Sequence, residues 1–258
     1  MGSAVVAFSL QKEGAPVAEN EDAYWVGDGG PRFLRVIVAD GASESMLASR
    51  WARHLVAVFG AAAENLCTAA GFTATYQRAA VSWEAEVTRY KRERAERNSP
   101  IQWYEEPGLG RGAYSTLLAA EFRRAPDGAG ARWAAAALGD SCLFQVRGEE
   151  LLSAFPMRSS DDFSNQPPLL SSNGVDAEVL SRYLSIETGE LAPEDTCYLA
   201  TDALSAWFLK TVETGDQPWR RLRVLDDIAP GEFSELIAKL RDDNQIRDDD
   251  TTLVRVDM

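Results

Sequence analysis

Hydrophobic and polar residues follow two periods along the chain, and each period predicts a different kind of element. Short apolar runs near the N-terminus predict strands at Ala4–Leu10, Ala23–Val26 and Phe33–Ala39. From Ser45 to about Gly60 apolar residues recur at helical spacing, which predicts a helix. The same spacing, with a charged end, predicts a second helix over Phe72–Asn98.

The rest of the chain continues with strands and helices in separate groups. The pattern predicts strands at Tyr114–Phe122, Trp133–Leu138, Cys142–Arg147, Cys197–Thr201 and Thr251–Val256, and helices at Ala203–Val212 and Phe233–Leu240. Gly, Pro and Ser residues predict loops at Ser99–Gly112 and Ser159–Gly174, the second a candidate flap. Because regular βαβ alternation is missing, we expect one layered α+β domain over residues 1–258.

The composition changes the list of partners to expect. The 258 residues are 45% hydrophobic, which is enough apolar material to bury a core. Lys and Arg number 26 against 40 Asp and Glu, so the formal net charge is −14. This charge repels phosphate backbones and anionic lipids, and we therefore expect neither nucleic acid nor a membrane as a partner.

No targeting or membrane-spanning segment is expected from the sequence. Met1–Glu13 has no basic region ahead of its short apolar stretch. The most lipid-like segment, Leu55–Phe72, is interrupted by polar residues and glycines, which favours a pair of soluble helices. The cysteines Cys67, Cys142 and Cys197 form no Cys-x-x-Cys pair, so we expect buried, reduced thiols in a cytoplasmic protein.

Aspartates stand at the ends of the predicted strands. They are Asp22, Asp40, Asp140, Asp202 and the run Asp248–Asp250. Each one alone also fits a turn-forming role. Carboxylates that converge from several strands repel one another unless a cation lies between them. Oxygen ligands without His or Cys favour Mg²⁺ or Mn²⁺ over Zn²⁺.

Six short motifs carry a resemblance to a known family. In chain order they are Glu19–Ala23, Val38–Gly41, Gly112–Thr116, Leu138–Ser141, Leu199–Asp202 and Asp249–Val254. Each motif alone is common, but all six in this order, over nearly the whole chain, resemble the metal-dependent protein phosphatase 2C family in its shorter bacterial form. The resemblance implies a central antiparallel β-sandwich flanked by helices on both sides, with two Mg²⁺ or Mn²⁺ ions at one end.

The resemblance also implies a role for each residue of the metal centre. Asp40 would bridge the two ions, and the carbonyl of Gly41 would bind the second ion. Asp202 and Asp249 would hold the first ion. With Asp40, these two aspartates would form the catalytic set.

Two further aspartates would complete the centre by the same resemblance. Asp22, with Glu21 beside it, would act through metal-bound water, and Asp140 would help to hold a third, weaker ion. Two ions that share a water lower its pKa and position it for in-line attack on a phosphomonoester, so no protein nucleophile is needed.

The turn after Asp40 departs from the family pattern. Ser43 and Glu44 stand where the family has glycines, and Ala42 stands where eukaryotic members have a His proposed as general acid. Ala203 replaces the usual Gly after the late-strand aspartate. These changes lie next to the implied ligands and bear on affinity and rate.

The substrate phosphate lacks its usual partner in this sequence. Val17 stands where many relatives carry an Arg, and Lys12 is the nearest cation. We predict that Lys12 binds phosphate as a point charge, with a solvated loop charge as the equal alternative. His54, the only histidine, lies mid-helix with no second base spaced to meet it, and we expect no catalytic role.

The motifs together predict a phosphatase that hydrolyses phosphoserine or phosphothreonine on proteins, opposing a serine/threonine kinase in signalling. Two alternatives stay open. One is a phosphatase-fold regulatory module that binds a partner or phosphopeptide with little turnover. The other is a Mg²⁺-dependent hydrolase of a small phosphate ester. The complete set of aspartates favours the first reading, because a binding module has no need to keep them.

Overall fold

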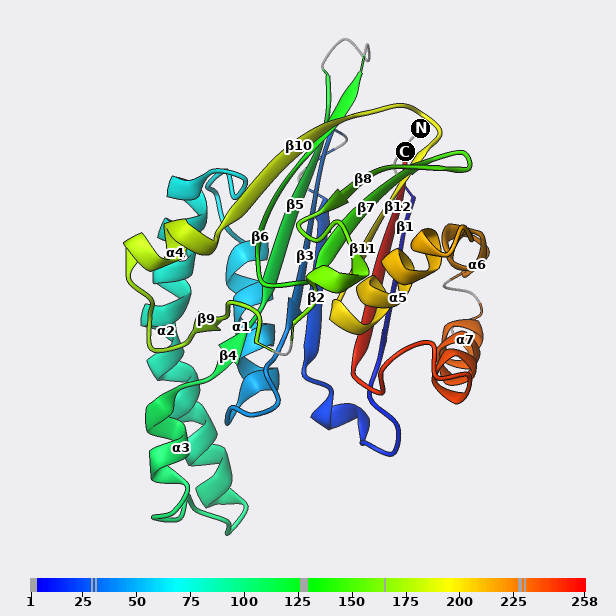
Figure 1. Cartoon of the computed structure of the whole chain (residues 1–258). Helices are drawn as coiled ribbons and strands as arrows, with labels where there is room; N and C mark the ends of the chain where they lie inside the picture. Colours follow the sequence, from blue (N-terminus) through cyan, green and yellow to red (C-terminus); the bar gives the residue numbers. More distant parts are fainter. Residues whose placement is uncertain are drawn as a thin grey trace.

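Two five-stranded antiparallel sheets form the centre of the molecule (Figure 1). This computed structural model describes residues 4–258 except 29, 31, 126–129, 165, 227, 228 and 230. The first sheet has, in spatial order, the strands β1 (Ala4–Leu10), β12 (Thr251–Asp257), β11 (Asp195–Ala200), β7 (Cys142–Arg147) and β8 (Glu150–Phe155). The second has β10 (Ser185–Leu191), β6 (Ala131–Leu138), β5 (Leu117–Arg124), β3 (Phe33–Asp40) and β2 (Asp22–Asp28).

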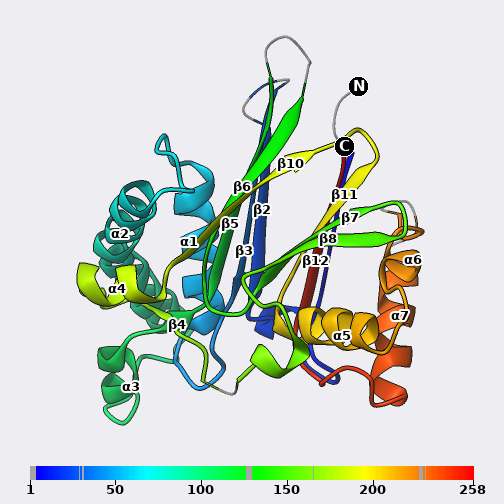
Figure 2. The ribbon, with the colours of Figure 1, turned by 45° about the horizontal axis from the view of Figure 1, so that its top comes forward.

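Helices cover both outer faces of this sandwich, as Figure 2 shows. The second sheet is covered by α1 (Ala48–Gly60), α2 (Ala69–Glu96) and α4 (Ala177–Tyr183). The first sheet is covered by α5 (Asp202–Glu213), α6 (Trp219–Leu222) and α7 (Gly231–Asp242). The predicted α+β sandwich with helices on both sides is therefore confirmed.

Three apolar layers hold the four layers of elements together. Alternate side chains of a strand point to opposite faces, so Val36 and Val38 of β3 pack between the sheets. Ile37 and Ala39 of the same strand pack against α1 and α2. Because both faces of β3 are buried, the strand is a continuous apolar run instead of an alternating one.

Several predicted loops contain regular structure, which corrects the sequence-based interpretation. The short helix α3 (Glu106–Arg111) lies inside the predicted loop Ser99–Gly112; Pro107 in its first turn is compatible with a helix start. The predicted loop Ser159–Gly174 contains a 3-10 turn at Ser160–Asp162 and the strand β9 (Leu170–Ser171), while its residue 165 lies outside the described residues.

The predicted strand Tyr114–Phe122 is divided into β4 (Tyr114–Ser115) and β5. β4 pairs with β9, while the amide of Thr116, between β4 and β5, bonds to the carbonyl of Asp40 and continues the register of β3 with β5. The pattern did not predict β8, β10, α4 or α6. The two strands lie at sheet edges, where polar side chains mask the alternation that marks a buried strand.

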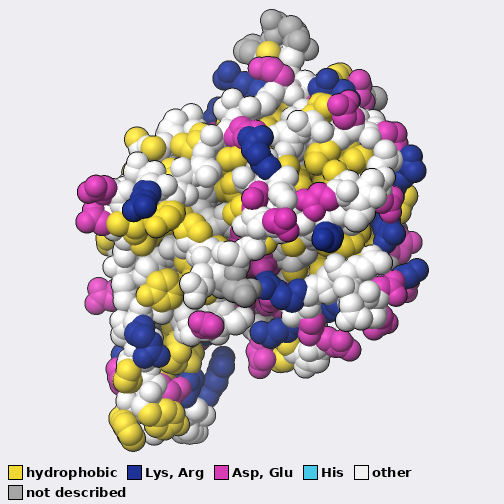
Figure 3. Space-filling view, in the orientation of Figure 1, with side chains coloured by type: hydrophobic (Ala, Val, Ile, Leu, Met, Phe, Trp, Pro, Cys, Tyr) yellow, Lys and Arg dark blue, Asp and Glu magenta, His cyan; other side chains and the backbone are white. Residues whose placement is uncertain are grey.

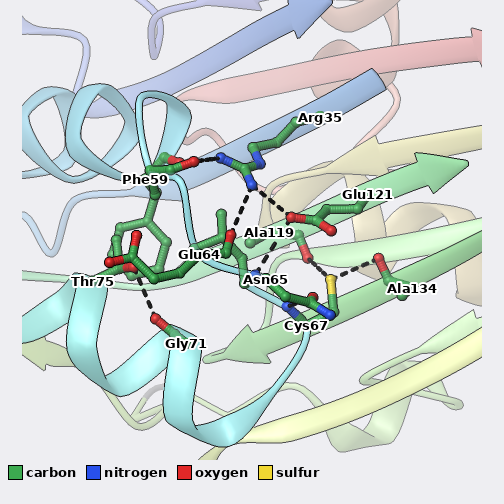
Figure 4. A network of polar contacts seen from close by, with 12 residues as sticks. Arg35, Phe59, Glu64, Asn65, Cys67, Gly71, Thr75, Ala119, Glu121 and Ala134 are labelled. Carbon is green, nitrogen blue, oxygen red and sulfur yellow. Dashed lines mark hydrogen bonds and ion pairs between the residues drawn. The ribbon is translucent and has the colours of Figure 1, made fainter. Parts of the chain in front are cut away.

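A buried ion pair fastens the connection between α1 and α2 (Figure 4). Arg35 and Glu121 lie directly opposite each other on β3 and β5, and both are almost fully buried. Their guanidinium and carboxylate are 2.7 Å apart. Arg35 also donates to the carbonyls of Phe59, Ala62 and Glu64. The pair therefore ties the end of α1 to the second sheet.

The α2–α3 lobe projects from the sandwich at the lower left of Figure 3, and hydrophobic side chains lie at its tip. Trp103 and Tyr104, in the α2–α3 connection, are 84% and 65% exposed. Elsewhere on this face acidic and basic side chains alternate without an extended patch of one sign. Among the described residues, no helix has the length and apolar character needed to span a membrane.

Candidate metal centre

The register between β2 and β3 places two aspartates side by side. Asp22 begins β2 and Asp40 ends β3, and the two residues are direct partners in the antiparallel ladder. Like charges at such a position destabilise a sheet. Asp22 is nevertheless buried, at 4% exposure, and its Oδ2 accepts a bond from the Thr201 hydroxyl at 3.0 Å. Its Oδ1 has no hydrogen-bond partner.

The motif Gly112–Thr116 holds the backbone of Asp40 and the turn that follows it. The carbonyl of Asp40 accepts bonds from the Thr116 amide and the Ser115 hydroxyl, both at 2.8 Å. Gly41 donates to the carbonyl of Glu21 at 3.2 Å and forms an isolated bridge with Ser115. The strand end that carries Asp40 is therefore held by the segments on both sides of it.

Both sheets contribute carboxylates to one cavity of about 560 Å³ at the end of the sandwich. Asp40 reaches it from the second sheet, and Asp140 lies in the turn between β6 and β7. Asp202 begins α5, two residues after β11 ends, and Asp249 lies two residues before β12 begins. Asp22 does not line the cavity, but it faces Asp40 across the strand pair.

Burial and mutual repulsion shift the titration of these groups. Burial raises the pKa of Asp22 and of Asp40 well above the usual range, and neighbouring carboxylates raise both further. Burial and Asp202 raise the pKa of Asp140 to about 7. The pKa of Asp202 is also raised, mainly by burial, although Arg247 opposes the rise. Such clustered carboxyl groups are typical of sites that a cation completes.

The donor chemistry fits Mg²⁺ or Mn²⁺, because the cavity offers carboxylate oxygens and the described residues bring no His or Cys to it. Asp22 and Asp140 each keep one buried oxygen without a hydrogen bond, which leaves that oxygen free to accept a bond from an ion or a water molecule. Yet within the described residues no group of three or more His, Cys, Asp or Glu side chains is arranged so that it could hold a metal ion. The donors are therefore gathered but not assembled into a ligand set.

An arginine that the sequence interpretation missed explains part of this arrangement. The guanidinium of Arg247 donates to Asp202 and lies 3.2 Å from Oδ2 of Asp249. The sequence offered one signal for this arginine, namely a basic residue two positions before the last motif. Its partner Asp202 lies 45 residues away, however, and this pairing cannot be read from the sequence.

Asp250 has a structural role that was also missed. Its two carboxylate oxygens accept bonds from the backbone amides of Lys12 and Glu21, at 2.8 and 2.6 Å. These bonds close the loop between β1 and β2 onto the start of β12. Asp250 thereby positions the segment that leads into Asp22.

Comparison with known proteins gives a consistent result for the fold. No family model and no curated protein matches the sequence. Solved structures do match: the Mycobacterium tuberculosis serine/threonine phosphatase PstP has a TM-score of 0.58 and 16% identity, over 100% of this chain and 99% of that one. The chain has the protein phosphatase 2C fold.

Two further structures carry the same protein phosphatase 2C fold. The catalytic domain of PstP in complex with two manganese ions has a TM-score of 0.56 and 18% identity, covering 99% of this chain and 97% of that one. Stp1, a serine/threonine phosphatase from Staphylococcus aureus, has a TM-score of 0.61 and 14% identity, covering 98% and 94%. The protein phosphatase 2C fold thus extends over the whole of this chain.

Lys12 lies beside the cavity of this protein phosphatase 2C fold without lining it. Its ammonium is 3.6 Å from the carboxylate of Glu21. Partial burial opposes the charge of Lys12, but Glu21 and the nearby aspartates together outweigh it and raise the pKa of Lys12. Its role in phosphate binding stays a prediction. Val17, at the position of the missing arginine, is 72% exposed.

A different arginine lines the same cavity as the carboxylates. Arg111, the last residue of α3, is exposed and makes no ion pair with any residue that the structure describes. Three residues that depart from the family pattern, Ala42, Ser43 and Glu44, line the same cavity. The Ser43 hydroxyl donates to Glu21, so the altered turn is tied to the residue beside Asp22.

His54 and the cysteines lie away from this centre. Nε2 of His54 bonds to the Ala79 carbonyl at 3.1 Å and the Ser82 hydroxyl at 2.8 Å, which fastens α1 to α2. Burial lowers its pKa. Cys67, Cys142 and Cys197 are free and buried, and burial raises the pKa of Cys67 to about 12. The predicted burial of the three thiols is confirmed, and buried thiols in apolar surroundings are poor nucleophiles.

Proposed function

We propose that this chain is a Mg²⁺- or Mn²⁺-dependent phosphatase that removes phosphate from phosphoserine or phosphothreonine of proteins. One observation carries the proposal: carboxylates from the strand ends of both sheets, Asp40, Asp140, Asp202 and Asp249, line a single cavity. The fold shared with PstP and Stp1 supports the same reading. We also propose that the protein acts in the cytoplasm, on the products of a serine/threonine kinase.

In this proposal some residues of the chain hold the metal ions and others bind the substrate phosphate. Asp40, Asp202 and Asp249 would hold two ions together with the carbonyl of Gly41, and Asp140 would help to hold a third. Bound Mg²⁺ or Mn²⁺ lowers the pKa of a water molecule and neutralises charge on the phosphoryl oxygens. Asp22, buried with one unpaired oxygen, would orient that water by accepting a hydrogen bond.

The substrate phosphate needs a cation in addition to the metal ions. Arg111 is suited to this task because it lines the cavity, lacks an ion-pair partner among the described residues and can bind phosphate with two parallel hydrogen bonds. Lys12 is the rival. Arg111→Ala should raise KM for a phosphopeptide by roughly five- to a hundredfold. Lys12→Ala serves as the comparison, and the variant with the larger rise in KM identifies the phosphate partner.

The activity can be tested with the full chain purified in chelator. Release of p-nitrophenol from its phosphate should depend on added Mn²⁺ or Mg²⁺ and vanish in EDTA. A phosphoserine and phosphothreonine peptide panel should give a higher kcat/KM than small phosphate esters, which separates a protein phosphatase from a small-ester hydrolase. Full activity in EDTA with no metal in the protein would refute the proposal.

A regulatory module with little turnover is the alternative, and the ion pairs of Arg247 with Asp202 and Asp249 favour it. A guanidinium on two of the proposed ligands opposes metal binding. The alternative predicts phosphopeptide binding without hydrolysis at saturating Mn²⁺, whereas the phosphatase predicts turnover. Isothermal titration and phosphate release on the same peptide therefore distinguish the two.

A further inference from the structure

Arg247 is placed where a metal ion and a side chain compete for the same oxygens. Its guanidinium donates to Oδ2 of Asp202 and lies 3.2 Å from Oδ2 of Asp249. Within the part of the chain that the structure describes, no other cationic side chain contacts either carboxylate. The positive charge that two neighbouring carboxylates require is thus supplied by the protein itself.

A divalent cation cannot join these two carboxylates while the guanidinium stays on them. Both cations need the same acceptor oxygens, and like charges at contact distance repel. Resting on the proposed function, we infer that Arg247 is a built-in counter-cation that Mg²⁺ or Mn²⁺ must displace from Asp202 and Asp249. Arg247 thereby lowers the metal affinity of the centre.

The surroundings of Arg247 allow this displacement. Its side chain is 56% exposed, whereas that of Asp202 is only 14% exposed. It belongs to the connection between α7 and β12, outside regular structure. It also lines a neighbouring cavity of about 360 Å³ together with Asp161. The guanidinium can therefore move into that space without disturbing either sheet.

The backbone of the last motif is held separately from this side chain. Arg241, whose side chain is only 9% exposed, donates to the carbonyl of Asp249 at 2.6 Å and also bonds to the carbonyl of Gln11. The following residue, Asp250, is held by the hydrogen bonds that its carboxylate accepts from the amides of Lys12 and Glu21. Asp249 thus stays in place when Arg247 leaves.

Mn²⁺ binding to the metal-free full chain, measured by isothermal titration, tests the inference without using activity. Arg247→Gln should lower the Kd for Mn²⁺ about three- to thirtyfold, because two partly exposed ion pairs no longer oppose binding. Arg247→Lys keeps the charge but lacks the two-pronged guanidinium, so its Kd for Mn²⁺ should lie between those of Arg247→Gln and the wild type. Arg221→Gln removes one exposed charge in α6, paired at 3.9 Å with Asp216, and should change the Kd by less than about twofold.

Thermal unfolding of the same proteins gives a second readout. Arg247→Gln should melt below the wild type without metal, because its carboxylates lose their counter-charge, and should show a larger rise on adding Mn²⁺. If Arg247→Gln binds Mn²⁺ with wild-type affinity, the inference is overturned and the metal centre stands. If neither wild type nor variants bind Mn²⁺, the proposed function fails and the inference fails with it.

Discussion

Gly41 offers a sharp test of how closely the centre is packed. A Cβ at this position would lie 2.8 Å from the carbonyl carbon of Ala48 and 2.9 Å from the carbonyl oxygens of Ala48 and Glu21. All three are backbone atoms, which cannot rotate away as a side chain can. An ordinary contact begins at 3.4 Å, so Gly41→Ala must push these segments apart by about 0.6 Å.

The expected losses of stability and of kcat both follow from this displacement. Overpacking of this kind costs roughly 1–3 kcal/mol, which lowers the melting temperature of a chain of this size by roughly 2–12 °C. Asp40 precedes Gly41 and moves with it. Because misplacement by about 1 Å at a reacting centre costs about a hundredfold, kcat should fall roughly ten- to hundredfold.

The measurement is metal-dependent hydrolysis of p-nitrophenyl phosphate together with thermal unfolding. Gly110→Ala is the matched control, because Gly110 lies in α3 near the cavity and a Cβ there meets no atom within 4 Å. This control should keep wild-type kcat and melt at or slightly above the wild-type temperature. If Gly41→Ala behaves like Gly110→Ala, the close packing of Gly41 against Ala48 at the start of α1 is wrong.

Three more substitutions, two of them with a matched control variant, test the carboxylates and the buried ion pair. Asp40→Asn should lower kcat by about two or more orders of magnitude. Without metal, Asp40→Asn should melt at or above the wild-type temperature at pH 7. The pKa of Asp40 is raised in the folded protein, so ionising this carboxyl costs stability as the pH rises through that pKa, and the cost is absent near pH 3. A lower melting temperature of the variant at pH 7 would contradict this. Asp249→Asn should lower metal-dependent activity in the same way, whereas Asp248→Asn should not, and equal losses would mean that the register of the last motif is wrong. Glu121→Ala should cost about 3–5 kcal/mol in urea unfolding, because the guanidinium that it pairs with stays buried, while the exposed Glu149→Ala should cost less than about 1 kcal/mol; equal costs would refute the role of burial.

The strand-end aspartates show what the sequence could predict. Asp40 and Asp140 come at the end of, or just after, apolar runs whose period marks a strand, so their place at strand ends was readable from local pattern. The direct pairing of Asp22 with Asp40 was not, because it depends on the register that the β2–β3 connection sets. Local pattern thus located the donors, and tertiary pairing brought them together.

The missed residues share a different reason. Arg247 pairs with Asp202, and Arg111 lines a cavity with residues that lie far from it in the sequence. A charged residue in a polar segment gives no local signal of such distant contacts. The helix α3 was missed because Gly108 and Gly110 lower its helix propensity, and tertiary packing overrides that preference. The sequence pattern missed the edge strand β10 for a related reason, because most of its residues are exposed or only partly buried.

The two sheets meet the cavity with separate sets of carboxylates, and the apolar layer between the sheets sets the distance between those sets. Asp40 belongs to the sheet that contains Val38, while Asp249 borders the sheet that contains Val254, and both valines lie in the shared middle layer. If these carboxylates bind ions as proposed, that layer acts as a spacer between them. A change of one methyl group at Val38 or Val254 would then alter the gap that an ion has to bridge, so the choice of ion and its affinity would depend on core residues that do not line the cavity.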